Sequence, residues 1–197
     1  MAKNDNSVNI ESSGENPGER YHHGDLRSAL VAEGLKRLKE GSAEGLSLRE
    51  IARNVGVSAT AVYRHFPDKA ALLGALAKVG DEMLAEAFAA AMAKEKPGHE
   101  AFNAMGRAYV RFALDNPSLF RLLMSPDSGK HSDKSRGRMM LVREIEALSG
   151  GKANEVQQDM KRLRAWSIVH GLAMLMLDGL VPSDDRIIER VVSSEIL

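Results

Sequence analysis

The segment 46–68 contains start and stop signals for two short helices in succession. These signals constrain the fold more than any other feature of the chain. Ser47 and Glu50 have the S-x-x-E spacing of a capping box, which marks the start of a helix. Gly56 is placed to end that helix, and Ser58 is placed to cap a second one. The segment therefore predicts two helices joined by a turn of three or four residues.

Residues that favour strands are scarce in the rest of the chain. It contains one threonine and 5% aromatic residues, it is rich in Ala, Leu, Met, Glu, Lys and Arg, and it has no alternation of period two. We predict an all-α fold with an N-terminal three-helix unit and a C-terminal helical domain. About nine helices are expected, at roughly 24–40, 48–55, 59–66, 69–94, 100–114, 118–124, 138–148, 154–180 and 184–197.

Composition excludes several classes of function. The absence of cysteine excludes disulfides, thiolate chemistry and cysteine-type zinc sites. The first twenty residues lack the apolar segment of a secretory signal, and the longest nearly apolar run, 166–177, is shorter than the roughly 18 residues of a membrane span. We expect a cytoplasmic protein with no membrane partner.

Charge is balanced overall but unevenly distributed. The net charge is zero, yet residues 1–19 carry one basic and four acidic side chains, whereas residues 20–69 carry nine basic and six acidic ones. Residues 1–19 are polar, contain Pro17 and two glycines, and are expected to be a disordered arm. The local excess of positive charge in 20–69 is compatible with a nucleic-acid partner without requiring one.

The segment 46–68 also meets the requirements of a helix-turn-helix motif. Ala52 is the small residue at the helix contact, Gly56 lies in the turn, and Val62 is the buried aliphatic residue of the second helix. The outward positions of that helix carry groups that suit a DNA major groove, namely Ala59, Thr60, Tyr63 and Arg64. An αα-hairpin that only packs is the alternative reading of the same spacing.

Three separated segments resemble the TetR family of bacterial transcriptional regulators. The stretch LSLREIARNVGVSATAVYRHFPDKAALLGAL is similar to the DNA-binding domain of that family, with its G-V-S, Y-x-H-F and D-K-x-x-L-L elements in order. YHHGDLR resembles the start of the first helix in one branch, and AWSIVHGLAMLMLDG resembles the Trp-x-x-x-His-Gly signature of a C-terminal domain in the same branch. The resemblance implies DNA binding by residues 20–85, and effector binding and dimerisation by residues 86–197.

The resemblance implies that the second helix of the motif enters the major groove. We expect Arg64 to read a base, because a guanidinium can pair bidentately with guanine. Tyr63, His65 and Lys69 are expected to contact backbone phosphates, the last at a helix N-terminus, and local packing is the alternative for the first two. The other expected DNA contacts are Ser47, Arg49, Ser58, Ala59, Thr60 and Ala61.

His22 and His23 do not form a predicted metal site. Adjacent residues on a helix diverge by about 100°, and no other ligand set with known spacing accompanies them. Asp25 is interpreted as a cap or first-turn acid. Tyr21, the histidines and Arg27 are expected either to have structural roles or to lie where the first helix meets the DNA backbone.

The C-terminal domain is expected to hold an effector pocket and a dimer interface. The run 166–177 is apolar on nearly all sides, and such a helix has to be buried on all sides. In a chain of this size we expect a partner subunit to bury part of it. Ordinary core packing is the alternative for each pocket residue, including the i, i+4 pair of Trp166 and His170. The pocket is predicted to include Phe120, Met124, Met139, Met140, Trp166, His170 and Met174. The interface is predicted to include Leu172, Met176, Ile187, Ile188, Val191 and Val192.

These observations predict a homodimeric, ligand-responsive repressor that binds a palindromic DNA operator. Its effector is expected to be small and mainly apolar with one hydrogen-bonding group, and no cofactor is expected. A DNA-binding protein of the same fold without a ligand, acting structurally or through a protein partner, is the first alternative. An enzyme is the second, and no carboxylate pair, nucleophile–base pair or phosphate loop supports it.

Overall fold

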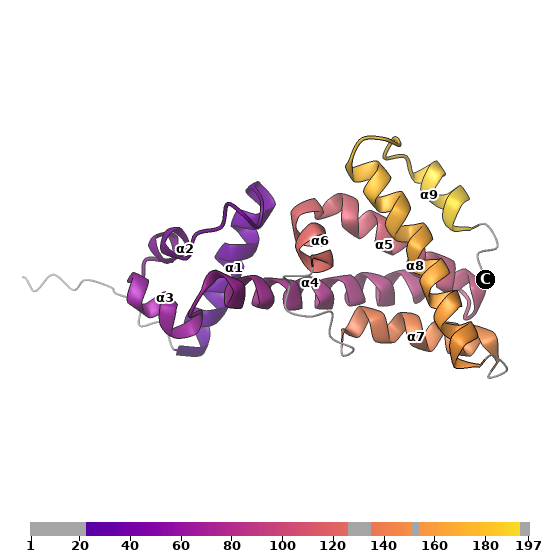
Figure 1. Ribbon diagram of the computed structural model, residues 1–197, viewed down its shortest axis with the longest axis horizontal. Helices are drawn as coiled ribbons and strands as arrows, with labels where there is room; N and C mark the ends of the chain where they lie inside the picture. The colour runs from indigo at the N-terminus through magenta and orange to yellow at the C-terminus, as the bar shows by residue number, and fades with distance from the viewer. Residues whose placement is uncertain (1–22, 126–134, 151–153, 194–197) are drawn as a thin grey trace, which may run out of the picture.

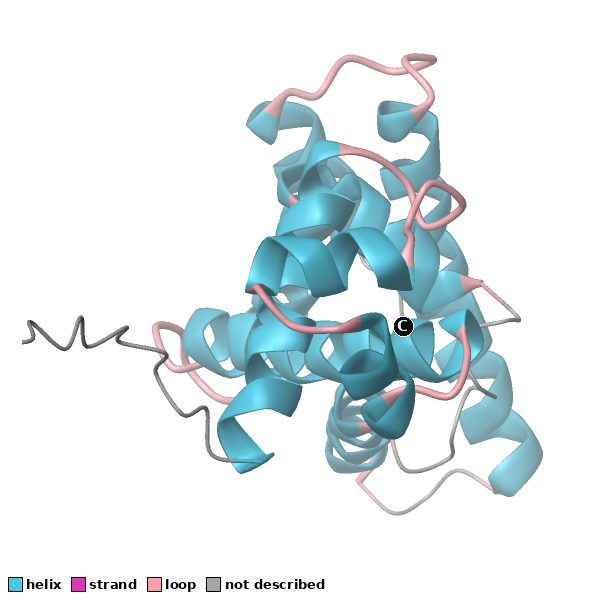
Figure 2. Cartoon of the chain, turned by 90° about the vertical axis from the view of Figure 1, so that its left-hand side faces the viewer, coloured by secondary structure: helices cyan, strands magenta, loops and turns pink. Residues whose placement is uncertain are grey.

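A computed structural model describes residues 23–125, 135–150 and 154–193, and within these ranges every regular element is a helix (Figures 1 and 2). The all-α prediction is confirmed. The expected arm at 1–19 and the pair His22 and His23 lie outside the residues whose side chains are described. The helices are α1 (His23–Glu40), α2 (Leu48–Val55), α3 (Ala59–His65), α4 (Lys69–Met92), α5 (His99–Asp115), α6 (Pro117–Met124), α7 (Arg136–Ser149), α8 (Glu155–Leu177) and α9 (Asp185–Val192).

Helix ends follow the local signals, with one exception at the start of α2. Ser47 is the N-cap residue in extended conformation, but its side chain makes no cap hydrogen bond. Glu50 pairs instead with Arg37 of α1 at 2.9 Å. The predicted capping box is therefore wrong, because the Glu50 carboxylate meets a cation on a neighbouring helix. A complete capping box forms at the start of α8, between Asn154 and Gln157.

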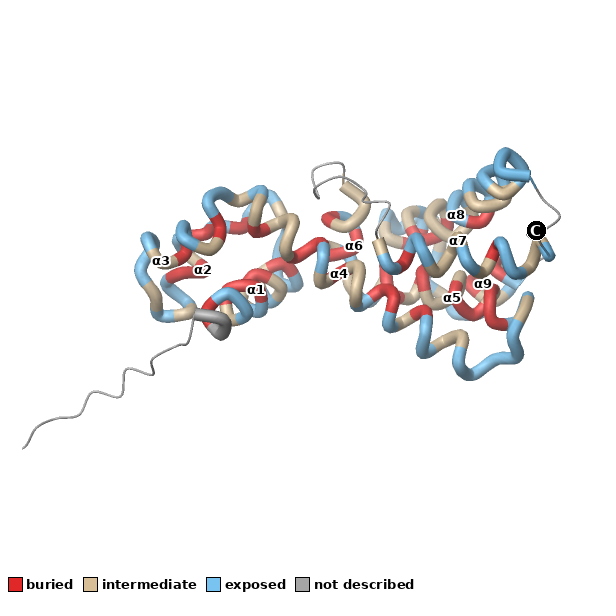
Figure 3. The backbone as a smooth tube through the Cα atoms, turned by 90° about the horizontal axis from the view of Figure 1, so that it is seen from below, coloured by how far each residue is buried: buried red, intermediate tan, exposed pale blue. Residues whose placement is uncertain are grey.

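Helix α4 joins the two ends of the molecule. Its 24 residues span about 36 Å, and Figure 1 shows α1 to α3 around one end and α5, α7, α8 and α9 around the other. The domain boundary expected at residue 85 falls inside this helix. The buried hydrophobic side chains form one cluster that extends from Leu26 to Val192, and the backbone of the buried residues is red in Figure 3. The two ends thus share a continuous core.

Helix α6 lies between α1 and the C-terminal helices. Ser118 Oγ donates a hydrogen bond to the Gly41 carbonyl at 2.5 Å, and Leu119 packs so closely on α4 that a Cβ at Gly80 would lie 3.0 Å from its Cδ1 atom. This short helix therefore contacts both α4 and the end of the molecule that α1 to α3 form.

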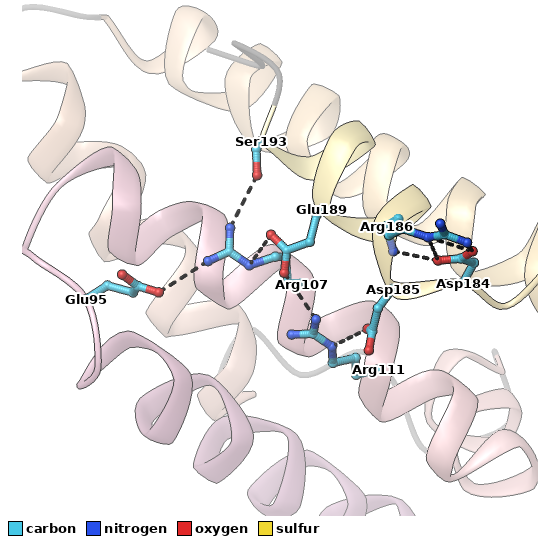
Figure 4. A network of polar contacts seen from close by, with 8 residues as sticks. All are labelled: Glu95, Arg107, Arg111, Asp184, Asp185, Arg186, Glu189 and Ser193. Atoms are coloured by element: carbon cyan, nitrogen blue, oxygen red, sulfur yellow. Dashed lines mark hydrogen bonds and ion pairs between the residues drawn. The ribbon is translucent and has the colours of Figure 1, made fainter.

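Ion pairs hold α9 against α5 (Figure 4). Arg107 pairs with Glu189 at 3.3 Å and with Glu95 at 3.4 Å. Arg111 donates to Asp185 at 2.8 Å and to Glu189 at 3.2 Å. The hydrogen bond to Asp185 is the largest cause of the raised pKa of Arg111. Networks of this kind fix geometry more than they add stability, because each pair is partly solvated.

No helix among the described residues combines the length and apolarity needed to cross a membrane.

Candidate nucleic-acid interface and internal cavity

The turn between α2 and α3 is built by one glycine and two buried contacts. Gly56 adopts the left-handed conformation, with φ of 78°, and its N–H bonds back to the carbonyls of Ala52 and Arg53. Ala52 and Val62 are buried where the two helices meet. A side chain larger than alanine at position 52 would separate the helices, so the contact sets the angle at which α3 is presented.

The outward face of α3 carries the residues that the sequence placed there. Ala59, Thr60, Tyr63 and Arg64 are exposed, with Tyr63 at 43%. Neither Arg64 nor the exposed Arg49 of α2 has a hydrogen bond or ion pair within the part of the chain that the structure describes. Two guanidinium groups are therefore uncommitted beside a polar, mostly small-residue helix face.

Some of the residues expected to contact DNA phosphates already make hydrogen bonds within the chain. Ser58 caps α3 by accepting from the Ala61 N–H at 3.2 Å. Lys69 Nζ donates to the Glu44 carbonyl at 2.5 Å, which leaves two of its three N–H donors. The N-terminus of α4 is capped by the Asp68 carboxylate, so the backbone N–H groups predicted to favour an anion there already meet a negative charge.

His65 and Ala61 lie at the margin of the same face. Both are half-buried, so each presents only part of its side chain outward. Arg27 lies with its guanidinium carbon 5.0 Å from the ring centroid of Phe66, a buried residue that directly follows α3. This contact ties the first turns of α1 to the end of α3.

A cavity of about 850 Å³ lies among α4, α5, α7 and α8. Of the seven predicted pocket residues, Met124 and Trp166 line it. Phe120 is fully buried behind the wall, with its ring 5.4 Å from that of Tyr109 and 5.7 Å from that of His170. His170 also lies behind the wall, bonded to Tyr109. The cavity is large enough for a small molecule.

The prediction is wrong for three methionines. Met139, Met140 and Met174 do not line the cavity, and Met139 is half exposed, beside a second hollow between α7 and α8. For Met139 and Met140 the reason is geometric, because α7 turns Arg138 and Leu141 toward the cavity and the two positions between them away from it. The lining part of α8 ends at Val169, before Met174.

Sequence reasoning missed a large group of cavity-lining residues. They come from α4 and α5, which pattern alone presents as ordinary core helices, and they include Leu84, Phe88, Phe102, Met105, Gly106 and Tyr109. A glycine in the middle of α5 was the one available signal. A Cβ at Gly106 would lie 2.7 Å from Val192 Cγ1, so the glycine permits close approach of α9.

Tyr109 organises the aromatic part of the wall. Its hydroxyl oxygen accepts from Trp166 Nε1 at 3.1 Å and lies 2.9 Å from His170 Nδ1. Burial raises the pKa of Tyr109 and lowers that of His170, so the phenol and the neutral imidazole are the favoured forms. The phenolic proton then goes to Nδ1, a better acceptor than the Met124 sulfur 3.6 Å away. His170 therefore makes a hydrogen bond inside its own chain, to Tyr109.

The predicted dimer residues divide into two groups. Leu172, Met176, Ile188 and Val192 are buried in the core of their own chain, so the prediction that these four face a partner is corrected. They face inward because α9 packs on α5 and α8. Ile187 and Val191 also pack against that core, but they are half-buried and keep part of their side chains exposed.

The outward face of α8 carries a stripe that the sequence pattern did not single out. Val156, Met160 and Leu175 are exposed and apolar, and Leu175 is 43% exposed. Ser167 and Gly171 lie between them on the same face, and a Cβ at Gly171 would meet no atom of the chain within 4 Å. Small residues flanked by exposed apolar ones would allow close helix approach.

Family models match both ends of the chain. A model of the tetR family of bacterial regulatory proteins matches residues 30–76, which include α2 and α3. A model of a tetracyclin repressor-like C-terminal domain matches residues 102–194, which include much of the cavity wall and the outward face of α8.

Solved structures share the architecture over most of the chain. A protein of unknown function from Rhodococcus sp. RHA1 is 32% identical, covers 89% of this chain and 94% of its own, and superposes with a TM-score of 0.73. A TetR family transcription regulator from Marinobacter aquaeolei VT8 is 19% identical, with coverage of 84% and 91% and a TM-score of 0.64. AibR, solved in complex with isovaleryl coenzyme A and operator DNA, is 16% identical, with coverage of 86% and 97% and a TM-score of 0.57. The last two comparisons establish the shared fold.

Proposed function

The chain belongs to the TetR family of DNA-binding transcriptional regulators, and on this premise we propose that it is a homodimeric repressor released from its operator by a small-molecule effector. The finer placement, in the branch with the Trp-x-x-x-His-Gly signature, stays a prediction. The matched families are regulators and not enzymes.

The exposed face of α3 is the observation that carries the DNA-binding role. Arg64 projects from a helix whose other outward residues are small or hydroxylated, and it is uncommitted within the described residues. A guanidinium in this position can donate two hydrogen bonds to one guanine in the major groove. Ser47 and Arg49, exposed at the start of α2, are proposed to bind the phosphates beside that groove. Thr60 and Tyr63 complete the proposed contact face.

A symmetric dimer would suit the recognition of a palindromic DNA operator. Two α3 helices related by a two-fold axis would enter successive major grooves about 34–36 Å apart. We assign the contact between subunits to the outward face of α8, with Val156, Met160 and Leu175, and to Ile187 and Val191 of α9. Val156, Met160 and Leu175 are large apolar side chains exposed on one helix, which favours their burial in an interface.

The cavity supports the effector-responsive role over the alternative of a ligand-free DNA-binding protein. A hollow of about 850 Å³, lined in large part by apolar side chains, has room for a small molecule. AibR, a regulator of the same fold, is solved with both a ligand and operator DNA. An effector that prefers one arrangement of the dimer would shift the population toward it and misalign the two α3 helices.

Arg64→Ala tests the DNA-binding proposal. A specific duplex is first selected from a random pool, and affinities for it and for an unrelated duplex are then measured by fluorescence anisotropy at several salt concentrations. Arg64→Ala is expected to cost about 1–3 kcal/mol on the selected duplex and to relax preference at one position per half-site. Lys69→Ala is expected to weaken both duplexes alike and to flatten the salt dependence.

Arg143→Ala, on the exposed surface of α7, is the matched control and should change neither affinity. Equal and sequence-independent losses for Arg64→Ala and Lys69→Ala would remove Arg64 from base readout. Absence of any selected sequence would overturn the proposed function.

A further inference from the structure

The aromatic end of the cavity offers an effector no unpaired hydrogen-bonding group at Tyr109. The Tyr109 hydroxyl already accepts from Trp166 and donates to His170. Around it the wall is apolar, with Phe88, Phe102, Met105, Leu123 and Met124. An effector group lying here gains from burial of its own apolar surface and gains nothing from a polar atom.

The charged residues of the cavity lie on the sides formed by α4, α7 and α8. They are Lys78, Asp81, Glu82, Arg138, Asp159 and Arg162. The numbers of positive and negative groups are equal, so their placement around the cavity, and not their sum, decides which charge an effector meets first.

Two of the three carboxylates are held by the start of α7. Asp81 accepts from Ser135 Oγ at 2.6 Å, from the Arg136 N–H at 2.8 Å and from the Gly137 N–H at 3.4 Å, which fixes it to the start of that helix. Glu82 pairs with the Arg136 guanidinium at 3.0 Å. Asp159 pairs with Arg162 within α8 and is largely exposed, so this last pair is readily exchanged for another partner.

Two guanidinium groups stand where the cavity meets a second hollow. Arg138 and Arg162 line the main cavity and also the hollow of about 400 Å³ between α7 and α8, which Arg143 lines as well. Glu146 is the acidic residue of that second hollow. The junction therefore presents arginines from two helices to a group entering from solvent.

The cavity is also elongated. It is lined along α4 from Gly74 to Phe88, and fourteen helical steps correspond to about 21 Å. An elongated space with an apolar interior and arginines along one side fits a molecule with an apolar chain and a charged end.

We propose that the effector is an anionic amphiphile, whose oxyanion headgroup, carboxylate or phosphate, pairs with Arg138 and Arg162 while its apolar chain lies against Phe88, Phe102 and Met105. Guanidinium groups bind such oxyanions through paired, charge-assisted hydrogen bonds. The proposal rests on the proposed function, since it names the chemical class of the effector.

Trp166 permits a direct test. It is the only tryptophan of the chain, and it lines the cavity, so its fluorescence reports binding to the full-length protein without DNA. Four probes that share a ten-carbon chain are titrated below their micelle concentrations: decanoate, decyl phosphate, decanol and decyltrimethylammonium. Decanoate or decyl phosphate is expected to bind at least tenfold more tightly than decanol, and the tighter of the two identifies the headgroup.

Variants locate the headgroup. Arg138→Gln and Arg162→Gln, singly and together, are expected to remove the tenfold preference for the anion while leaving decanol binding unchanged. Arg53→Gln is the matched control, because Arg53 is an exposed, ion-paired arginine at the other end of the molecule, and it should keep the full preference. Circular dichroism melts of all variants verify that they fold.

Tightest binding by decanol or by the ammonium probe would overturn the proposal, as would a preference for the anion that survives the double variant. The absence of any fluorescence change with all four probes would overturn it too. Binding to the selected DNA duplex is measured on the same preparations. If DNA binding persists and the anion preference fails, only the effector class is wrong; if DNA binding is absent, the proposed function itself fails.

Discussion

Close approach of α5 and α9 at Gly106 makes a quantitative prediction about stability. Replacing this glycine with alanine would place a Cβ atom 2.7 Å from Val192 Cγ1 and 3.3 Å from Val169 Cγ1. Val192 is buried, so its side chain has little room to move away. Gly74 provides the matched control, since it is also helical and lines the same cavity, but a Cβ added to it would meet no atom within 4 Å.

Two effects of opposite sign decide how much each substitution changes the free energy of unfolding. Alanine is favoured over glycine within a helix by about 1 kcal/mol, and both substitutions gain this amount. Overpacking in a filled core costs about 1–3 kcal/mol, and only Gly106→Ala has this cost. Gly74→Ala is therefore expected to stabilise the protein, and Gly106→Ala to range from neutral to about 2 kcal/mol destabilised. The difference between the variants isolates the overlap with Val192.

Thermal and urea unfolding followed by circular dichroism measure this difference at one protein concentration, so that dimerisation does not bias the comparison. At about 2–4 °C per kcal/mol for a chain of this length, Gly106→Ala should melt roughly 2–12 °C below Gly74→Ala. Equal melting temperatures for the two variants would refute the reasoning, because α9 would then not lie against α5 at this point.

Two further predictions concern α8. Leu175→Arg on its outward face is expected to yield monomers in light scattering, whereas Met83→Arg, at a comparably exposed position of α4, should leave the dimer intact; a dimeric Leu175→Arg would place the interface elsewhere. Burial lowers the pKa of His170 below its ordinary value of about 6.5, so below that pH the unfolded chain takes up a proton that the folded chain resists. The contribution of neutral His170 to the free energy of unfolding is therefore complete above the pKa of the unfolded chain. It is lost as the pH falls through the pKa of the folded chain. The free energy of unfolding of the native chain, measured relative to His170→Gln, should therefore shrink from pH 7.5 to 5.5, and a constant difference would contradict it.

The helices were predictable because their ends carry local signals. Gly56 stops α2, Ser58 and Asp68 cap the next two helices, and Pro117 opens α6. Each of these signals acts through backbone hydrogen bonds within a few residues, so a reading of neighbouring residues suffices. The prediction of a capping box at Ser47 was wrong because Glu50 pairs with Arg37, ten residues before the cap. A rule based on neighbouring residues cannot foresee a contact with another helix.

The outward-facing residues of α3 were predictable for a related reason. In a short helix the identity of one buried residue fixes the direction of all the others, and Val62 fixes α3. Ala59, Thr60, Tyr63 and Arg64 then have to face outward. The cavity offered no such reference point, because its walls come from six helices and depend on how these are arranged in space. Methionines at 139, 140 and 174 were plausible by composition, but side-chain type does not determine which way a helix is rotated.

Helix α8 shows the limit of a pattern most clearly, since its apolar residues lie in three different surroundings. Leu172, Ala173 and Met176 pack in the core of the chain, Trp166 and Val169 line the cavity, and Leu175 is exposed. A core, a ligand and a second subunit all select apolar residues, so the sequence indicated that the helix is covered without indicating by what. Because one rigid helix carries all three groups of residues, any rotation that admits a ligand beside Trp166 also turns Leu175 and Gly171 on the opposite side. Occupancy of the cavity and the geometry of the proposed dimer are therefore coupled through α8 itself.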